Sequence, residues 1–342
     1  MRILSISLDR RVLDPSTVVA QRQVEYFRGH EVSFIVLEDP GKSKILIFLS
    51  AWMRARKERG FDLVTTQDPF FCGWIGRVAA RHMKIPLHVQ DHSGAFARAP
   101  FGWKERLMYP VARSIVKQAQ RIRTVSQRGK RGLMTLGIPE LKIDVIPIAT
   151  DIALFSKVDR SLALPNEILT VTRLEREKGV DVLLQAFVEV QKARPQTSLV
   201  VVGDGSLRRA YERMARRLGV GASVLFVGKE ADVKPFLARA GVYVQPSRFE
   251  GWGLAVVEAA AAGMPIAMTD VGCAGEVIED RKSGLIVPPA NSHALAGALI
   301  TLLSDPELGR RLASEARVRV SALPNPEGTA QRIRASFEAA KI

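Results

Sequence analysis

The segment QPSRFEGWGLAVVEAAAAGMPI, Gln245–Ile266, gives the clearest indication of the fold. Its first residue ends an apolar run, Val242–Gln245, that is typical of a strand. A helical pattern begins near Leu254 and stops at Gly263, and a second strand-like run, Pro265–Thr269, follows. A strand, a glycine-containing loop, a helix and another strand form the repeating unit of a parallel sheet covered by helices.

The same alternation extends in both directions from this segment and restarts once along the chain. The expected strands are Arg2–Leu8, Val32–Leu37, Leu63–Thr66, Leu87–Gln90, Ile122–Val125, Val145–Pro147, Ile168–Thr172, Leu199–Val202, Val224–Val227, Val242–Gln245, Pro265–Thr269 and Gly284–Val287. The expected helices are Val18–Arg28, Gly73–His82, Trp103–Ala119, Arg128–Leu136, Val180–Ala193, Leu207–Leu218, Leu254–Ala262, Ser292–Ser304 and Pro306–Val320. This pattern predicts an α/β protein with two doubly wound, Rossmann-like domains.

Chain length and one polar stretch suggest where the domains divide. The chain has 342 residues, which is long for a single core and sufficient for two. Asp151–Pro165 is polar and weakly periodic, so we expect domains at residues 1–156 and 157–326 that face a central cleft. Leu323–Pro326 interrupts the last helical pattern, because proline removes a helical hydrogen bond and clashes with the preceding turn. We therefore expect a C-terminal helix, residues 327–342, to pack back on the first domain.

The composition is that of a soluble globular protein with an uneven positive charge. Hydrophobic residues make up 47% and the net charge is +15, of which residues 1–155 contribute +11. The longest apolar run, Ile45–Trp52, is far shorter than the ~20 residues of a membrane span, and we expect neither a transmembrane helix nor a signal peptide. Cys72 and Cys273 lack metal-ligand spacing and are typical of buried thiols in a reducing cytoplasm.

The loop and helix after Gln245 carry the most specific site prediction. Gly251 and Gly253 allow backbone N–H groups near Gly253 and Leu254 to point at a phosphate, which the helix dipole also favours. Glu250 lies in the loop, and Glu258 is the acidic residue of an otherwise apolar helix. A carboxylate at Glu258 can accept hydrogen bonds from a ribose diol, as acidic residues do in dinucleotide-binding folds. A helix cap with a solvated glutamate would not explain that acidic position.

Two further segments place candidate ligand-binding groups directly after strands. In VTRLEREKGVDVLLQA, Val171–Ala186, Arg173 follows a strand and Lys178 with Gly179 precedes a helix. Two cations beside a helix N-terminus suit a diphosphate, although a solvated basic loop would have the same composition. Gly203 and Gly205 allow a tight turn and close ligand approach, or a turn that serves packing alone. A fourth glycine-containing segment, Thr269–Val287, could close the site with Gly272, Gly275 and Glu276.

The first half offers one candidate site at a strand end. VQDHSG, Val89–Gly94, places Asp91 and His92 beside a glycine at the end of a strand, where we expect a functional role for His92. His88 precedes them within the apolar run and is expected to be structural.

With these residues in place, the chain resembles the retaining glycosyltransferases of family four, which have the GT-B fold. The resemblance covers the second half in family order: Arg173 with Lys178–Gly179, Gly203–Gly205, Gly228, the pair Glu250/Glu258, and Gly272 with Glu276. It implies that Arg173 and Lys178 bind the donor diphosphate, that Glu258 binds the ribose and that Glu250 lies beside the transferred sugar. The base would be held around Val227–Lys229 and Val233.

The first half resembles the family more loosely, at Phe61–Pro69, Val89–Ser93, Thr124–Ser126 and Val145–Asp151. His92 would take the position of an acceptor-side histidine. The family often has a glycine-rich loop after its first strand, whereas Leu8–Ser16 contains no glycine. Cys273 also stands where a second glycine is common.

The expected activity is hexosyl transfer with retention from a nucleotide-diphosphate sugar, of UDP or GDP type, to a glycan or lipid-linked acceptor in polysaccharide or glycolipid biosynthesis. Glu250, His92, Arg173 and Lys178 are the expected catalytic residues; Gly203, Gly228, Gly251, Gly253, Leu254 and Glu258 complete the donor site. No Asp/His ligand set is clustered, so we expect no metal and no cofactor. An epimerase or phosphorylase on the same fold is the alternative. Nucleic-acid binding would leave Glu250 and Glu258 unexplained.

Basic segments of the first half suggest where the protein acts. Lys42–Arg59 has apolar residues flanked by bases, and Lys104–Arg131 carries nine Lys/Arg. Both predict attachment of a cytoplasmic protein to the inner face of an anionic membrane, with a merely soluble basic surface as the alternative.

Overall fold

A computed structural model describes residues 1–38, 43–100 and 102–341. Lys42, the first residue of the basic segment Lys42–Arg59, and Ile342, the last of the predicted C-terminal helix, lie outside the described residues. The chain forms two compact units, which we call unit 1 (Met1–Ala149 with Pro326–Ile342) and unit 2 (Thr150–Asn325). Each unit contains a six-stranded sheet in which all strand pairs are parallel. The predicted α/β class with two parallel sheets is therefore confirmed.

Unit 1 has the strand order β2-β1-β3-β4-β5-β6. Its strands are β1 Arg2–Ser7, β2 Glu31–Val36, β3 Leu63–Thr66, β4 Leu87–Asp91, β5 Arg121–Thr124 and β6 Ile143–Val145. Its helices are η1 Arg10–Leu13, α1 Val18–Tyr26, α2 Lys44–Lys57, α3 Phe71–Met83, α4 Gly102–Gln118, α5 Gln127–Thr135, η2 Glu140–Lys142 and α13 Pro326–Ala339, where η marks a 3-10 helix.

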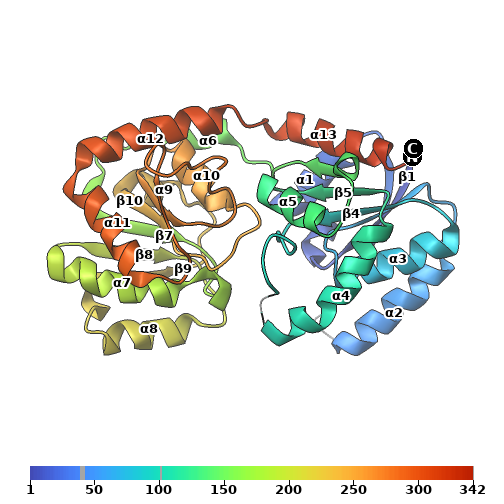
Figure 1. Ribbon diagram of the computed structural model, residues 1–342, viewed down its shortest axis with the longest axis horizontal. Coiled ribbons are helices and arrows are strands. Elements are labelled where there is room, and N and C mark those ends of the chain that lie inside the picture. The colour runs from blue at the N-terminus through green and yellow to red at the C-terminus, as the bar shows by residue number, and fades with distance from the viewer. Residues whose placement is uncertain (39–42, 101, 342) are drawn as a thin grey trace. The chain divides into compact units, whose positions relative to one another are not determined.

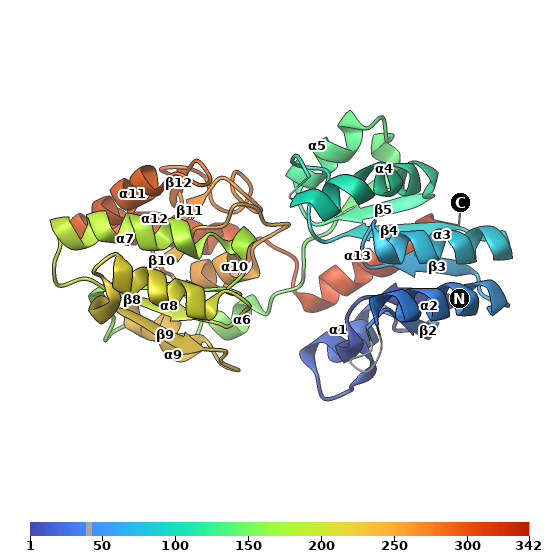
Figure 2. The same ribbon diagram turned by 90° about the horizontal axis from the view of Figure 1, so that it is seen from below.

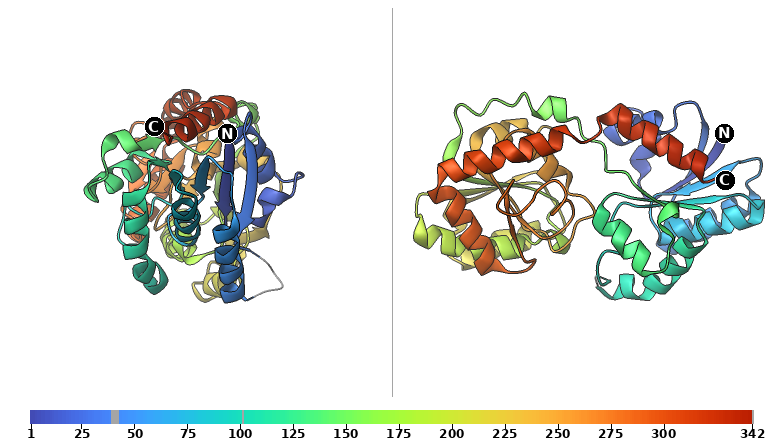
Figure 3. Two further views of the ribbon diagram at one scale, coloured as in Figure 1. Left: turned by 90° about the vertical axis from the view of Figure 1, so that its right-hand side faces the viewer. Right: turned by 45° about the horizontal axis from the view of Figure 1, so that its top comes forward.

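Helices cover both faces of this sheet. Successive side chains of a strand point to opposite faces, and in this sheet the side chains on both faces are buried. Leu4 and Ile6 of β1 pack with α2, α3, α4 and α5 on one face. Ile3 faces the opposite way and packs with α1 and with Phe337 of α13. Figure 1 shows α13 above and α2, α3 and α4 below the strands, and Figure 3 shows α13 lying across them. The C-terminal helix thus completes the core of unit 1.

Unit 2 has the strand order β12-β11-β10-β7-β8-β9. Its strands are β7 Leu164–Val171, β8 Ser198–Val202, β9 Val224–Gly228, β10 Ala240–Gln245, β11 Ile266–Thr269 and β12 Leu285–Val287. Its helices are α6 Ile152–Phe155, η3 Arg176–Lys178, α7 Val180–Ala193, α8 Arg208–Arg217, η4 Gly221–Ser223, α9 Lys234–Arg239, α10 Leu254–Ala261, α11 Ser292–Ser304 and α12 Pro306–Ser321. One core joins α7, α8 and α11 to the sheet, and α10 packs against α12 and α6. Figure 1 shows α6, α10 and α12 above the strands.

The strand orders fix where ligands can enter each unit. In unit 2 the chain leaves neighbouring strands β7 and β10 toward opposite edges of the sheet, and in unit 1 it does so from β1 and β3. Such reversal points leave a crevice at the carboxyl ends of the strands. Across the described part of the chain, no helix is both long enough and apolar enough to span a bilayer.

Candidate functional site

The two loops at the reversal point of unit 2 touch each other. The loop after β7 ends at Gly179, whose φ of +67° favours glycine. A Cβ atom at Gly179 would lie 2.1 Å from the carbonyl oxygen of Pro246, so no side chain fits there. The Arg248 N–H donates to the carbonyl of Glu177 at 2.7 Å. These contacts fix the start of α7 against the loop after β10.

An ion pair joins the two loops at their centre. Lys178 Nζ lies 2.6 Å from Glu250 Oε1, and the two side chains are only 14% and 13% exposed. Gln245 Nε2 and Ser247 Oγ donate to the same carboxylate oxygen at 3.1 and 2.9 Å. A partly buried pair whose carboxylate has additional donors is oriented before any ligand arrives.

A buried tyrosine extends this network into the sheet. The Tyr243 hydroxyl donates to Gln245 Oε1 at 2.7 Å. Burial raises the pKa of Tyr243 well above its ordinary value, and the negative charges of Glu258 and Glu250 raise it further. Both glutamates are therefore close enough to Tyr243 for their charges to act on it. The sequence predicts a strand end at Gln245, but no local pattern identifies Tyr243, Gln245 or Ser247 as partners of Glu250.

The N-terminus of α10 lies in the same loop. Gly253 is the N-cap with a φ of +97°, and it has no side chain with which to cap the first turn. Its carbonyl accepts hydrogen bonds from Val256 and Val257, whereas N–H groups earlier in a first turn point out of the helix. Glu258 follows on this helix and is half-buried. The arrangement can bind an anion at the helix end and hydroxyl groups at Glu258.

The loop after β11 packs against the residues that precede α10. The Cys273 N–H donates to the carbonyl of Trp252 at 2.8 Å. A Cβ atom at Gly272, which has a φ of +58°, would lie 2.4 Å from that carbonyl oxygen. The Trp252 side chain is buried. Gly272 therefore shapes the Glu250–Gly253 loop by close packing.

Arg173 is placed differently from Lys178. Its side chain is 69% exposed and pairs with Glu177 at 3.0 Å. Its guanidinium is thus available at the surface of the loop after β7, whereas Lys178 is held by Glu250. The structure brings Lys178 and Glu250 together and leaves Arg173 at the margin.

The glycines after β8 make backbone contacts. The Gly203 N–H donates to the carbonyl of Gly228 at 2.7 Å, and a Cβ atom at Gly203 would lie 1.8 Å from the Thr172 carbonyl oxygen. A Cβ atom at Gly205 would lie 2.6 Å from the Leu174 carbonyl oxygen. These contacts give Gly203 and Gly205 a packing role, and donor binding by Gly203 and Gly228 stays a prediction.

A second ion pair beside the site was not predicted. Arg248 binds Asp181 of α7 with two hydrogen bonds of 2.7 and 2.6 Å, and it also donates to the carbonyl of Arg176 at 3.0 Å. Burial alone would raise the pKa of Asp181, but the hydrogen bonds from Arg248 lower it. Arg248 lies within the segment singled out from the sequence, yet no periodicity connects it with Asp181.

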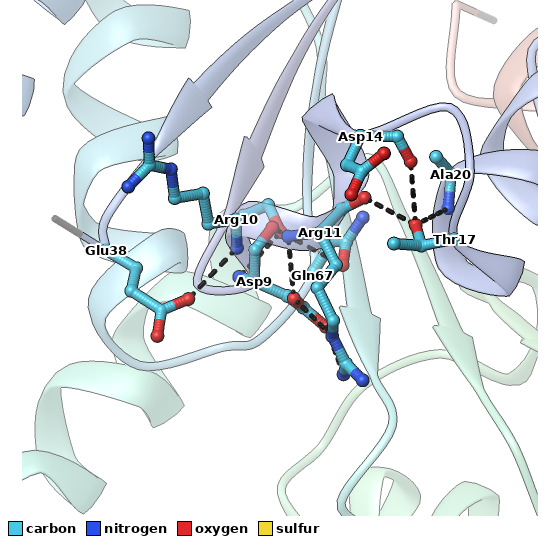
Figure 4. Close-up of polar contacts among 9 residues, drawn as sticks. Asp9, Arg10, Arg11, Asp14, Thr17, Ala20, Glu38 and Gln67 are labelled. Atoms are coloured by element: carbon cyan, nitrogen blue, oxygen red, sulfur yellow. Dashed lines mark hydrogen bonds and ion pairs between the residues drawn. The ribbon is translucent and has the colours of Figure 1, made fainter. Parts of the chain in front are cut away.

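The loop after β1 in unit 1 is held by side chains where the family often has glycine (Figure 4). Asp9 Oδ1 accepts from the Arg11 N–H at 3.0 Å, and both carboxylate oxygens bind the Arg11 guanidinium. Those hydrogen bonds lower the pKa of Asp9. The Arg10 N–H donates to Glu38 Oε2 at 3.0 Å, and Ser7 Oγ donates to Gln67 Oε1 at 3.4 Å.

Asp91 and His92 follow β4 in unit 1. Asp91 is fully buried and its Oδ1 accepts from the Ser93 hydroxyl at 2.9 Å and the Ala95 N–H at 3.1 Å, which makes it a turn-forming residue. Burial raises the pKa of Asp91. His92 is half-buried, and desolvation, followed by the charge of Arg123, lowers its pKa to about 3. At neutral pH the imidazole of His92 is therefore uncharged.

Two buried residues near this strand end have structural partners. His88 bonds to Thr65 Oγ1 at 2.9 Å and to Ser336 Oγ of α13 at 3.0 Å, in line with the structural role expected for it. Arg123 was not predicted: it is almost fully buried and donates to Gln90 Oε1 at 2.7 Å. Burial lowers the pKa of Arg123 to about 10.

Among the described side chains, no group of three or more His, Cys, Asp or Glu is arranged to hold a metal ion.

Known proteins with similar sequences are glycosyltransferases. A Mycobacterium tuberculosis glycogen synthase is 35% identical over 159 residues, which cover 46% of this chain and 38% of the relative. An alpha-D-kanosaminyltransferase of Streptomyces kanamyceticus is 26% identical over 255 residues, which cover 69% of this chain and 66% of the relative. In both cases the match therefore spans less than two thirds of the relative's own length.

Solved structures share the fold over almost the whole chain. Sucrose-phosphate synthase from Thermosynechococcus elongatus has a TM-score of 0.81 at 22% identity, covering 99% of this chain and 98% of that one. Anabaena HepE in complex with UDP has a TM-score of 0.76 at 19% identity, covering 99% and 100%. These similarities confirm the expected GT-B fold.

Two family matches account for nearly all of the chain. Residues 13–154, all but the last five of them in unit 1, match the family described as Glycosyltransferase Family 4. Residues 156–319, in unit 2, match the family described as Glycosyl transferases group 1. The site residues Lys178, Glu250 and Glu258 all lie within the second match. The chain belongs to the family-four, group 1 glycosyltransferases.

Proposed function

We propose that this protein transfers a hexose from a nucleoside-diphosphate sugar to a hydroxyl group of a glycan or lipid-linked acceptor, with retention at the anomeric carbon. The observation that carries the proposal is the Lys178–Glu250 pair, held at 2.6 Å beside the N-terminus of α10 at the reversal point of unit 2. A cation, a helix N-terminus and a fixed carboxylate at one strand edge suit a diphosphate linked to a sugar. Family membership supports the same reaction class.

In this proposal unit 2 binds the donor. Lys178 and the first turn of α10 bind the diphosphate, and the exposed Arg173 adds a second cation once the donor is present. Glu258 accepts hydrogen bonds from the ribose hydroxyls. All three donors described for Glu250 converge on Oε1, so Oε2 is left as an acceptor for a hydroxyl of the transferred sugar. UDP or GDP is the proposed nucleotide; the solved HepE complexes contain UDP and, in one case, UDP-glucose.

The proposed transfer breaks the bond between the anomeric carbon and the diphosphate oxygen. The acceptor oxygen bonds to the same face of that carbon, and its proton passes to the departing phosphate. Negative charge grows on the diphosphate, so Lys178, Arg173 and the α10 N–H groups stabilise the transition state. The neutral imidazole of His92 provides a hydrogen-bonding group on the acceptor side.

A thermal-shift screen with UDP-, GDP- and ADP-sugars tests donor binding, because a ligand that binds only the native state raises its stability with the logarithm of the ligand concentration once that exceeds Kd. Turnover is then measured with the matching donor. We expect Lys178→Ala and Arg173→Ala to lower kcat by about 10²–10³ each, whereas Arg217→Ala, an exposed cation at the far end of α8, leaves it unchanged. Normal turnover by Arg173→Ala would refute the diphosphate assignment.

The second candidate is an epimerase or phosphorylase on the same fold. A transferase releases free nucleotide in step with transfer to an added acceptor, whereas an epimerase changes the sugar without releasing nucleotide. A phosphorylase instead requires inorganic phosphate or a sugar phosphate. Nucleotide release that depends on neither acceptor nor phosphate would contradict both the transferase and the second candidate.

A further inference from the structure

One side of α2 presents apolar side chains to solvent. Ile45, Leu46, Leu49 and Met53 are 74%, 57%, 47% and 52% exposed. Their spacing places them within roughly 100° of one another around the helix axis. The opposite side of α2 is buried against α3 and β2, so the exposed side chains form a separate stripe.

Neighbouring helices add to this surface. Phe71, at the start of α3, is exposed, and its ring lies 6.1 Å from that of Phe48 on α2. Trp103 and Leu107 are exposed on the first turns of α4. Figure 2 shows α2, α3 and α4 side by side on one face of the unit 1 sheet. In Figure 1 both α2 and α4 begin at the bottom of unit 1 as drawn. Exposed apolar side chains thus gather on one face of unit 1, which we call the α2–α4 face.

Basic side chains flank the stripe. The last turn of α2 contains Arg54, Arg56 and Lys57, and its first turn contains no acidic residue. Arg54 pairs with Glu58 at 3.0 Å, which leaves a net positive charge at this end of the helix. Arg54 also lines a pocket of about 280 Å³ between α2, β2 and the loop after β1, together with Arg10 and the apolar Leu13. In Figure 4 the Arg10 guanidinium points away from the Asp9–Arg11 pair. The pocket therefore combines two guanidinium groups and one carboxylate, that of Glu38, with an apolar wall, and its charged lining has a net positive charge.

We propose that the α2–α4 face docks on an anionic phospholipid bilayer. Ile45, Leu46 and Leu49 enter the boundary between head groups and acyl chains, and the arginines bind lipid phosphates. An interfacial helix needs an apolar side and adjacent cations, and both occur here. A nucleic acid would be attracted by the charge but would not bury four aliphatic side chains. The net charge of +11 on residues 1–155 has the sign that an anionic surface attracts.

The proposal goes beyond the transfer reaction and can be tested without it. The full chain is co-sedimented with vesicles of phosphatidylcholine alone or mixed with phosphatidylglycerol. We expect binding to the mixed vesicles, weakened as the salt concentration rises. The double variant Leu46→Ser/Leu49→Ser should bind at least about tenfold more weakly, because each leucine loses its apolar burial. The double variant Arg10→Gln/Arg54→Gln should bind several-fold more weakly to the mixed vesicles, with no change in its binding to phosphatidylcholine vesicles.

A matched control removes an exposed apolar residue from the other side of unit 1. Val24 on α1 is 67% exposed, and α1 covers the opposite face of the sheet. Val24→Ser should therefore bind vesicles like the unmodified protein. Equal binding to both vesicle types, no binding to either, or equal losses for Val24→Ser and the leucine variant would overturn the proposal. Circular dichroism and the donor-induced thermal shift check that each variant is folded, so failure here leaves the transferase proposal untouched.

Discussion

At the scale of single residues, the candidate site depends on contacts between positions far apart in the sequence. Lys178 and Glu250 are 72 positions apart, and Arg248 and Asp181 are 67 apart. Strand ends and glycines identify which loops approach the site, because those signals are local. Which cation meets which carboxylate depends on the tertiary packing of the loops. For that reason the positions of Lys178 and Glu250 could be predicted, whereas the Arg248–Asp181 pair could not.

Gly179 tests how closely the two loops must approach. Gly179→Ala should destabilise unit 2, because a left-handed φ costs an alanine about 1 kcal/mol and the Cβ at 2.1 Å from Pro246 adds about 2 kcal/mol of overpacking. Gly219→Ala is the matched control, since Gly219 has a φ of +77° with nothing within 4 Å. Urea unfolding measures both. Equal losses for the two variants would show that the contact with Pro246 contributes nothing.

His88 makes the stability of unit 1 depend on pH. Burial lowers its pKa to about 3, while the ordinary value is 6.5. Between these values the unfolded chain binds a proton that the folded unit does not. The contribution is therefore complete above pH 6.5 and is lost as the pH falls toward 3, by on the order of 5 kcal/mol in total. Urea unfolding across this range should show a shallower loss for His88→Gln than for the control His82→Gln, which changes an exposed histidine. Identical profiles would exclude His88 as the source.

At the scale of elements, most strands and helices could be predicted because each buries one face. β1, β3, β4 and β8 lie within one residue of the expected runs. The helix α2 was not predicted: it buries one stripe and exposes another apolar stripe, so its apolar residues are not confined to one side of the helix. β7 begins at Leu164, four residues before the expected start, because pairing with β8 and β10 extends the strand over residues 164–167, which include proline and two polar residues. The expected strand Val145–Pro147 was wrong by two residues, since β6 ends at Val145.

The helix α13 should be essential to unit 1. Phe337 is fully buried, and its ring stacks on that of Phe27 and forms a T-shaped pair with that of His88, with ring centroids 5.3 and 5.0 Å apart. Phe337→Ala should lower the free energy of unfolding of unit 1 by about 3–5 kcal/mol through the lost apolar burial and the resulting cavity. Tryptophan fluorescence in urea provides the measurement, with the exposed Arg332→Ala as control on the same helix. A loss under 1 kcal/mol for Phe337→Ala would mean that α13 is an attachment to unit 1 and not part of its core.

At the scale of the whole molecule, the chain has separate hydrophobic cores in its two units, and these should open independently. Lys178, Glu250 and Glu258 all lie in unit 2, so a bound donor should stabilise unit 2 alone. At a donor concentration of one hundred times Kd the gain is about 2.7 kcal/mol. Hydrogen exchange followed by mass spectrometry should then slow about a hundredfold in the core of α7 and α11, with β4 and α13 unchanged. Equal slowing in α13 would show that the units open together, and slowing confined to unit 1 would move the donor site out of unit 2.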